Sequence, residues 1–278
     1  MSVMDTVKST YRKPLQTLDQ LGEELAFYIL VLVKTPRAVR RYSKEVWRLL
    51  AEITLGTGAL AVIGGTVGII LGMTFFTGAQ VGLSGFAALD QLGTAALSGF
   101  VSAYFNTREI APLVSGIAMA ATVGCGFTAQ LGAMRISEEV DALEVMAIPS
   151  LPYLVSTRVM AGLIAIVPLY VVGLLSSYAA SQIVTTTFYG QSSGTYEHYF
   201  NTFLPPEDVL WSFGKVLVFA VVVILIHCYH GYNASGGPAG VGVAVGKAVR
   251  TSIVAVSVID LFLSMAIWGT ATSVRLAG

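Results

Sequence analysis

The chain has 278 residues, of which 55% are hydrophobic and only 12% are charged, and its mean hydropathy is +0.74. A soluble globular domain carries about 25% charged residues, so this chain lacks the polar surface that a water-soluble core requires. The formal net charge is zero, which argues against nucleic acid as a partner. The composition excludes an ordinary soluble domain and predicts an all-α integral membrane protein that crosses the bilayer several times.

Basic residues are concentrated near the N-terminus, where residues 1–48 hold nine of the sixteen Lys and Arg. Residues 1–14 are polar and contain no apolar core ahead of a cleavage site, so we expect no secretory signal peptide. Residues 21–50 show an amphipathic pattern typical of a helix that lies in the headgroup plane. Its basic face, expected to contact anionic lipid on the cytoplasmic side, consists of Lys34, Arg37, Arg41, Lys44 and Arg48. A charged face that is only solvated is the alternative interpretation.

Five later apolar runs are long enough to cross a hydrocarbon layer of about 30 Å. They lie at residues 53–77, 110–134, 159–184, 209–229 and 248–274. We therefore divide the chain into a cytoplasmic N-terminal region, residues 1–52, and a transmembrane domain, residues 53–278.

A sixth run, residues 82–105, affects the topology. It is rich in glycine and carries Asp90 and Gln91, and all later loops would change sides if it crossed the membrane. The positive-inside rule favours five spans, with residues 82–105 re-entrant or lying on the extracytoplasmic surface. The N-terminus is then cytoplasmic, the C-terminus is extracytoplasmic, and the polar, aromatic residues 185–208 form an extracytoplasmic loop.

Small residues recur at every fourth position in two of the predicted spans. In lipid, such residues let helix backbones approach closely, so they mark packing faces. The glycines concerned are Gly64, Gly68 and Gly72 in the first span and Gly116 and Gly124 in the second. The pattern leaves two interpretations open, packing within the chain and a dimer seam.

The glycine-rich residues 236–246 do not form an ATP site. A P-loop has the pattern Gly-x-x-x-x-Gly-Lys-Ser/Thr, whereas Lys247 is followed by Ala248, and Val241 holds the position of the first glycine. A cytoplasmic turn between two helices is the better interpretation. We expect no cofactor in this chain.

Two other kinds of site receive little support. Ser84 lies in a Gly-x-Ser-Gly sequence like that of rhomboid-type intramembrane serine proteases. Five spans, however, place it about 30 Å from His227 and His230, across the hydrocarbon layer. The two histidines and Cys228 also lack a fourth metal ligand nearby. We expect neither catalytic residues nor a metal site.

One ionisable residue falls inside a predicted span. Asp260 has Ser257 and Ser264 one turn away on either side, and Lys215 lies near the outer end of the preceding span. Ionisable groups in a membrane indicate a functional site, although an Asp satisfied by neighbouring hydroxyls can be structural. The chain lacks the series of carboxylates and the inverted repeat typical of a proton-coupled secondary transporter acting alone, which remains an alternative function.

Residues 135–149 form the most unusual segment. Ser137 is suited to cap a helix over residues 135–147, and Pro149 is suited to end it. One face of this helix is apolar and the other is acidic; the residues are Ile136, Val140, Leu143 and Ala147 on the first and Glu138, Asp141 and Glu144 on the second. A compact acidic element suits docking into a basic groove of a soluble partner; an ordinary solvated loop helix is the alternative.

Several motifs together resemble one family. They are Arg108–Pro112, Thr128–Met134, Ser137–Met146, Tyr153–Arg158, His227–Tyr232 and Gly236–Gly242. In combination, from about Leu21 to the C-terminus, the chain resembles the MlaE/YrbE permeases, the membrane subunits of ABC transporters that act with MCE-domain proteins to move lipids across bacterial envelopes. It is most similar to the YrbE proteins of mce operons, and Tyr196–Phe200 resembles the loop of their B-type subunit.

The resemblance implies an amphipathic interfacial helix, five spans, a re-entrant-like segment after the first span, and a coupling helix at residues 135–148 that sits in a cleft of a cytoplasmic ATPase. The residues it implies for that contact are Arg135, Glu138, Glu139, Asp141, Leu143 and Glu144. The family pattern has Glu-Gln where this chain has Glu138-Glu139. A single acidic contact is therefore doubled here.

The resemblance also implies partners. These are a homologous YrbE permease in a heterodimer, an ATPase dimer that binds ATP and Mg, extracytoplasmic MCE proteins, and a lipid cargo. Sterols are the first expectation for the cargo and fatty acids the second. We expect the complex in the cytoplasmic (inner) membrane, with no covalent chemistry in this chain.

Overall fold

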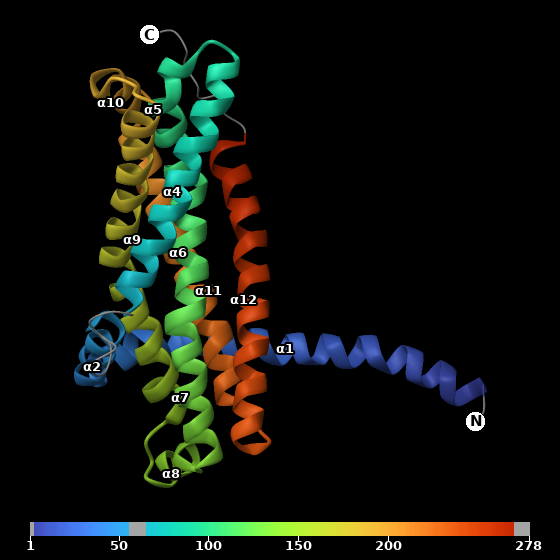
Figure 1. The fold of residues 1–278 in the computed structure, drawn as a ribbon. Helices are drawn as coiled ribbons and strands as arrows, with labels where there is room; N and C mark the ends of the chain where they lie inside the picture. The colour runs from blue at the N-terminus through green and yellow to red at the C-terminus, as the bar shows by residue number, and fades with distance from the viewer. Residues whose placement is uncertain (1–2, 56–64, 270–278) are drawn as a thin grey trace.

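The computed structural model describes residues 3–55 and 65–269, and within these ranges all regular structure is helical. Five helical segments are long and apolar enough to cross a membrane. They run over Thr66–Gln91, Ala95–Ile136, Pro152–Phe188, Pro206–Tyr232 and Gly237–Trp268 and stand side by side as a bundle (Figure 1). The predicted all-α membrane architecture with five spans is confirmed.

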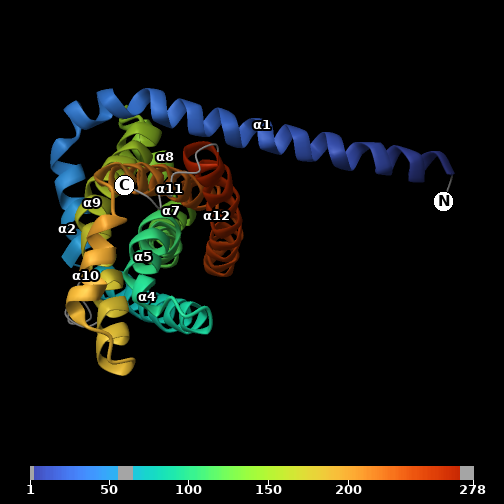
Figure 2. The ribbon, with the colours of Figure 1, turned by 90° about the horizontal axis from the view of Figure 1, so that it is seen from above.

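Two helices precede the bundle. α1 (Val3–Arg41) lies across the bundle, near the end that carries α8 (Glu139–Val145), and projects far beyond it (Figure 1). α2 (Ser43–Leu55) then wraps around the side of the bundle (Figure 2). Both helices bury a narrow apolar face, including Val31 and Leu49, and expose their charged side chains together with apolar ones such as Ile29, Val33 and Trp47. This is the amphipathic arrangement that the sequence predicts for an interfacial segment.

The first hairpin corrects the prediction for residues 82–105. α4 (Thr66–Gln91) runs straight through the first half of this segment, and the second half already belongs to the next span. The chain turns at residues 92–94, where Gly93 adopts a φ of +69°, a conformation that glycine reaches without strain. The segment is thus a helical hairpin between two spans and not a separate re-entrant helix.

The same finding shifts the first span toward the C-terminus. It was predicted at residues 53–77, whereas the described helix starts at Thr66 and α2 already occupies the positions up to Leu55. Residues 56–64 of the predicted span lie outside the described residues.

The second span is the longest. Its 42 residues extend over about 60 Å at about 1.5 Å per residue, roughly twice the hydrocarbon thickness, so it projects from the membrane. It contains two π-helical stretches, of a kind that is frequent at functional sites. In order, its parts are η1 (Ala95–Leu97), α5 (Ser98–Val101), η2 (Ser102–Ile110), α6 (Ala111–Met119), η3 (Ala120–Gly124) and α7 (Cys125–Ile136).

The remaining spans match the predicted ones with altered ends. They are built from η4 (Pro152–Ser156), α9 (Thr157–Ile183) and η5 (Val184–Phe188), then α11 (Pro206–Tyr232), then α12 (Gly237–Trp268). α12 begins eleven positions before the predicted residue 248, after a turn in which Gly236 and Gly237 have positive φ. The predicted residues 270–274 of this span lie outside the described residues.

The loop expected at residues 185–208 is largely helical. Its central helix, α10 (Ser193–Thr202), packs on α5 at the end of the bundle opposite α8. Gly99 makes this contact possible, because a Cβ there would lie 2.2 Å from the carbonyl oxygen of Tyr196. We refer below to the two ends of the bundle as the α8 end and the α10 end.

The glycine pattern divides into inward and outward positions. A Cβ at Gly116 or Gly124 would meet Phe219 or His227 inside the bundle, so these glycines pack within the chain. Gly68 is exposed, and nothing lies within 4 Å of a Cβ at Gly72. Gly64 lies outside the described residues.

A close backbone contact between two spans involves glycines that the pattern did not single out. α4 packs against α9 through Gly78 and Gly82, where added Cβ atoms would lie 2.4 Å and 3.0 Å from the carbonyl oxygens of Ser177 and Ser181. The Ser181 hydroxyl also donates a hydrogen bond of 2.6 Å to the Gly78 carbonyl. Close backbone approach between these two helices thus requires glycine.

We predict that Gly78→Ala destabilises the bundle. The new methyl group forces α4 away from α9, at a cost of about 1–3 kcal/mol, and we expect a lower Tm in detergent. Gly72→Ala is the matched control on the same helix, and its Tm should stay equal or rise, because alanine favours a helix by up to about 1 kcal/mol. Equal Tm losses for both variants would contradict the assigned contact.

Candidate functional site

The segment around α8 forms a projecting knob at the α8 end. α7 ends at Ile136, and the Ser137 hydroxyl donates to the Ala133 carbonyl at 2.9 Å. Ser137 therefore closes α7 and does not cap the next helix, as the sequence had suggested. Glu138 follows with a φ of +61° and reverses the chain, and Ala147 has a φ of +57° after α8. The predicted single helix over residues 135–148 is thus a helix end, a turn and a seven-residue helix.

The faces of the knob match the predicted pattern in part. Val140 is 1% exposed and Leu143 is half-buried, so these two side chains anchor α8 on the bundle. Ile136 and Ala147 are instead exposed. The turn at Glu138 separates Ile136 from the buried face, and Ala147 lies beyond the end of α8, where its own φ is positive. The acidic side chains of Glu138, Glu139, Asp141 and Glu144 are all exposed.

Four of the predicted contact residues already have polar partners within the knob, and one of these contacts is a hydrogen bond of 3.1 Å from the Ser137 hydroxyl to Glu139. Arg135 Nη1 forms an ion pair with Asp141 Oδ1 at 2.7 Å, and Glu144 accepts a hydrogen bond of 2.7 Å from Ser150. Glu138 and Glu139 form no ion pair among the described side chains. The strongest outward negative charge of the knob is therefore at this adjacent pair.

The sequence analysis missed an apolar tip on the knob. Val145 is 88% exposed and Met146 is 61% exposed, next to the acidic side chains. The sequence did contain a signal for this apolar tip. Val145 lies four residues after Asp141, so on a helix it falls on the acidic face and not on the buried one. An apolar centre with charged neighbours is typical of a protein–protein contact.

A buried ion network lies at the α10 end. Lys215 of α11 is 1% exposed; its Nζ lies 2.7 Å from Asp260 Oδ1 of α12 and 3.4 Å from Glu109 Oε2 of η2. Ser264 donates to Glu109 and to neither oxygen of Asp260, and Ser257 donates to the backbone of Ile253. The Asp260 carboxylate is therefore held by a lysine, and not by the neighbouring hydroxyls considered from the sequence.

The Arg108-Glu-Ile-Ala-Pro112 sequence explains part of this geometry. Pro112 has no N–H, so the Arg108 carbonyl lacks the donor that an α-helix would supply at i+4. Lys215 Nζ donates to that carbonyl at 2.7 Å. The ammonium group thus compensates a backbone acceptor as well as two carboxylates.

A second buried pair adjoins the first. Arg108 Nη2 lies 2.7 Å from Asp208 Oδ2, and Trp268 Nε1 donates to the other oxygen of Asp208 at 2.8 Å. The arginine also lies over the ring of Tyr104, 4.1 Å from its centroid. The residues that converge here come from η2, α11 and α12, so the network ties three parts of the bundle together.

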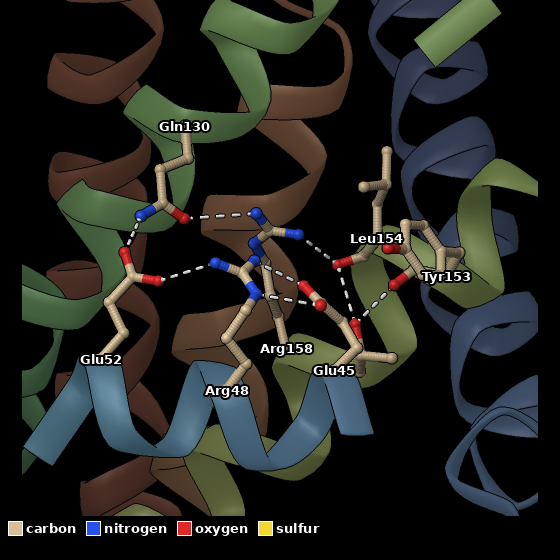
Figure 3. A network of polar contacts seen from close by, with 8 residues as sticks. Glu45, Arg48, Glu52, Gln130, Tyr153, Leu154 and Arg158 are labelled. Atoms are coloured by element: carbon tan, nitrogen blue, oxygen red, sulfur yellow. Dashed lines mark hydrogen bonds and ion pairs between the residues drawn. The ribbon is translucent and has the colours of Figure 1, made fainter. Parts of the chain in front are cut away.

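A third network joins α2 to the bundle near the α8 end (Figure 3). Arg48 forms ion pairs with Glu45 at 2.6 Å and with Glu52 at 3.6 Å, and Gln130 of α7 donates to Glu52. The buried Arg158 of α9 donates to Gln130 at 3.2 Å and to the backbone carbonyl of Leu154 at 2.7 Å. The interfacial helix is thus hydrogen-bonded to the span that carries the knob.

The predicted headgroup-contact residues have different environments. Arg37, Arg41 and Lys44 are exposed, and Lys34 is half-buried. Arg48 is exposed but engaged by two carboxylates. The hydrogen bond from Arg48 holds the pKa of Glu45 below its ordinary range, and the same contact raises the pKa of Arg48.

The structure does not bring together the residues of a serine protease. Ser84 lies in the last part of α4 toward the α10 end, where its hydroxyl accepts from Gln80 at 2.8 Å. His227 is buried near the α8 end of α11; its Nδ1 lies 2.8 Å from the Thr128 hydroxyl and its Nε2 lies 3.2 Å from the Ser252 hydroxyl. These contacts join α7, α11 and α12. Among the described residues, no group of three or more His, Cys, Asp or Glu is placed to hold a metal ion.

The five apolar spans, the two preceding amphipathic helices and the projecting knob define a polytopic helical membrane protein. The family model described as Permease MlaE matches residues 56–266. The chain belongs to the MlaE permease family.

Curated relatives agree with this assignment. The chain is 26% identical to a "Probable ABC transporter permease protein" of Rickettsia bellii, over 94% of this chain and 97% of the relative. It is 28% identical to "Protein TRIGALACTOSYLDIACYLGLYCEROL 1, chloroplastic" of Arabidopsis thaliana, over 80% of this chain and 69% of the relative. A "Probable ABC transporter permease protein" of Synechocystis is 31% identical, over 62% of this chain and 65% of the relative.

We predict that Lys215→Met strongly destabilises the protein. It leaves Asp260 and Glu109 without their cation, and breaking a buried ion pair costs about 3–5 kcal/mol. The double variant Lys215→Met/Asp260→Asn should recover part of the lost Tm, because one of the stranded charges is then neutral. Thermal unfolding of the wild type, both single variants and the double variant measures this coupling. Strictly additive losses would contradict a direct interaction.

We also predict a pH-dependent contribution from Glu45. Since its pKa is lowered from the ordinary 4.5, the pair with Arg48 stabilises the attachment of α2 above that value and loses this effect as pH falls through the lowered pKa. The Tm difference between the wild type and Glu45→Gln should be present at neutral pH and vanish in acid. Lys44→Gln, at the adjacent exposed position, should show no such pH dependence; a Glu45→Gln difference that persists in acid would count against the assignment.

Proposed function

We propose that this chain is the permease subunit of an ABC transporter that moves lipids across the bacterial cell envelope, and that ATP is hydrolysed by a separate subunit. The observation that carries the proposal is the knob at the α8 end, which presents Glu138, Glu139 and the apolar tip Val145–Met146 beyond the bundle. The printed names of the relatives support an ABC transporter.

The orientation follows from charge. The basic α1 and the knob lie at the same end of the bundle (Figure 1), and Lys and Arg are enriched on the cytoplasmic side of membrane proteins. We therefore assign the α8 end to the cytoplasm, where the knob meets a cytoplasmic ATPase dimer that binds ATP and Mg. The basic face of α1 and α2 then contacts anionic headgroups of the inner membrane, and the α10 end is extracytoplasmic.

The environment of each side chain supports a particular set of residues for the proposed ATPase contact. Val140 and Leu143 fix α8 to the bundle, and the Arg135–Asp141 pair fixes the turn before it. These residues therefore position the knob, while Glu138, Glu139 and the apolar tip remain available to a partner. A complementary basic groove would supply orientation and specificity.

The proposed cargo and remaining partners rest on the family. The name of the Arabidopsis relative is that of a lipid, which supports a lipid cargo here; sterols are the first choice and fatty acids the second. A homologous YrbE-type permease would pack on the outward glycines Gly68 and Gly72 of α4. Extracytoplasmic MCE proteins would bind at the α10 end, near α10.

Charge reversal of the knob tests the proposal. We predict that Glu138→Lys/Glu139→Lys weakens capture of the ATPase subunit at least about tenfold and abolishes lipid uptake, because two charge-assisted contacts become repulsive. Membrane insertion and Tm should be retained, since neither side chain is buried. Co-purification of the ATPase from native membranes, with uptake of labelled lipid, measures both effects.

The matched control is Asp90→Lys, which reverses an exposed charge at the α10 end and should leave ATPase capture unchanged. Val145→Asp/Met146→Asp should reproduce the loss of capture without reversing a charge. Unchanged capture and uptake in both knob variants would overturn the proposed coupling role.

A further inference from the structure

A pocket of about 350 Å³ lies between α1 and the segment that follows α8. Its α1 wall carries three cations, Lys34, Arg37 and Arg41, spaced three and four residues apart on one face. Its opposite wall is formed by Ala147 and by the prolines at 149 and 152. A pocket of this size can hold a small ligand or a headgroup.

The cations of the pocket differ from Arg48 and Arg135, which are paired within the chain, and resemble Arg40 and Lys44, which form no ion pair among the described side chains. Arg48 pairs with Glu45 and Glu52, and Arg135 pairs with Asp141. Lys34, Arg37 and Arg41 form no ion pair among the described side chains, and the pocket lining contains no carboxylate. Three converging positive charges without an internal counter-charge attract an anion.

The remaining walls indicate what accompanies that anion. Ala38 at the base of the pocket is 3% exposed, and Tyr42 and the two prolines add further apolar surface. An anion with an apolar extension matches this combination better than a free ion does. The amphipathic α1 also lies where the headgroups of the cytoplasmic leaflet are expected.

We propose that this pocket is a binding site for the headgroup of an anionic phospholipid, with the phosphodiester held by Lys34, Arg37 and Arg41 and the glycerol portion against the apolar wall. Guanidinium groups bind phosphate through paired hydrogen bonds. The site turns the general headgroup contact of α1 proposed above into a defined pocket. It depends on the cytoplasmic assignment of the α8 end but not on the lipid cargo or the ATPase.

A bound headgroup would join two elements that lie far apart in the sequence. One wall belongs to the interfacial helix and the other to the chain between the knob and α9. A bound phosphodiester therefore bridges α1 to the return segment of the knob. The anionic lipid content of the membrane would in this way influence the position of the coupling element.

The test is a binding titration of the full-length chain in a nonionic detergent. Dihexanoyl phosphatidylglycerol, dihexanoyl phosphatidylcholine and inorganic phosphate are titrated by calorimetry. We expect the phosphatidylglycerol to bind, and the other two ligands to bind at least about tenfold more weakly. Arg37→Ala/Arg41→Ala should weaken phosphatidylglycerol binding at least about tenfold, because two charge-assisted interactions are lost.

Arg40→Ala is the matched control, since Arg40 is an exposed cation on the same helix but does not line the pocket. It should leave the affinity unchanged. Ala147→Asp tests the opposite wall without altering any cation; aspartate tolerates the positive φ at this position, and its carboxylate should reduce the affinity at least about tenfold. All variants should keep the wild-type Tm.

Three outcomes would overturn the site. They are the absence of phosphatidylglycerol binding, equal binding of inorganic phosphate, and equal losses from Arg40→Ala and Arg37→Ala/Arg41→Ala, which would indicate diffuse attraction. Because the assay involves neither ATPase nor transport, its failure would leave the permease function standing. Failure of the knob variants would likewise leave this lipid site standing.

Discussion

The bundle depends on the cost of placing an ion in a medium of low dielectric constant. A buried charge must be paired and hydrogen-bonded, or its desolvation exceeds any gain. Lys215 shows how the constraint acts, because its ammonium group contacts carboxylates from η2 and α12 and also donates to the backbone carbonyl of Arg108. Removing any one of these groups would leave another buried polar group without one of its partners. The rotation of α11 and α12 about their axes is therefore fixed at the α10 end.

At the α8 end the same constraint acts on a more open network. Arg158 is buried and donates to Gln130 and to a backbone carbonyl through its two terminal nitrogens, while its Nε has no hydrogen-bond partner among the described residues. The chain of contacts continues through Glu52 to Arg48, which is exposed. Polar contacts that reach solvent are weaker than buried ones and can rearrange at low cost. The spans are thus rigidly fixed to one another at one end, while the interfacial helix is attached at the other end by interactions that can adjust. The knob, for which we propose the coupling role, lies at this adjustable end.

The sequence predicted the number of spans but not their ends, for physical reasons. Total hydrophobicity determines how often the chain crosses the membrane, whereas the end of a span depends on local backbone conformation, as at the turn over residues 92–94, where Gly93 has a positive φ. The knob was located correctly and its shape was not, because Glu138 and Ala147 adopt positive φ without being glycine. The pairing of Asp260 with Lys215 could not be derived either. It depends on the relative rotation of two helices, which spacing along one helix does not contain.

The charged side chains that are paired within the chain differ in role from those at the surface that are not. Where a charged side chain is buried, as at Arg158 and Lys215, its partners lie within the chain and it serves the fold. At the surface of the α8 end, some charges are compensated internally, such as Arg135 and Asp141. Glu138 and Glu139 on one side of that end, and the three cations of the α1 pocket on the other, form no ion pair among the described side chains. Both sets are therefore free to meet a counter-charge outside the chain, which is the basis of the two proposals made above for them.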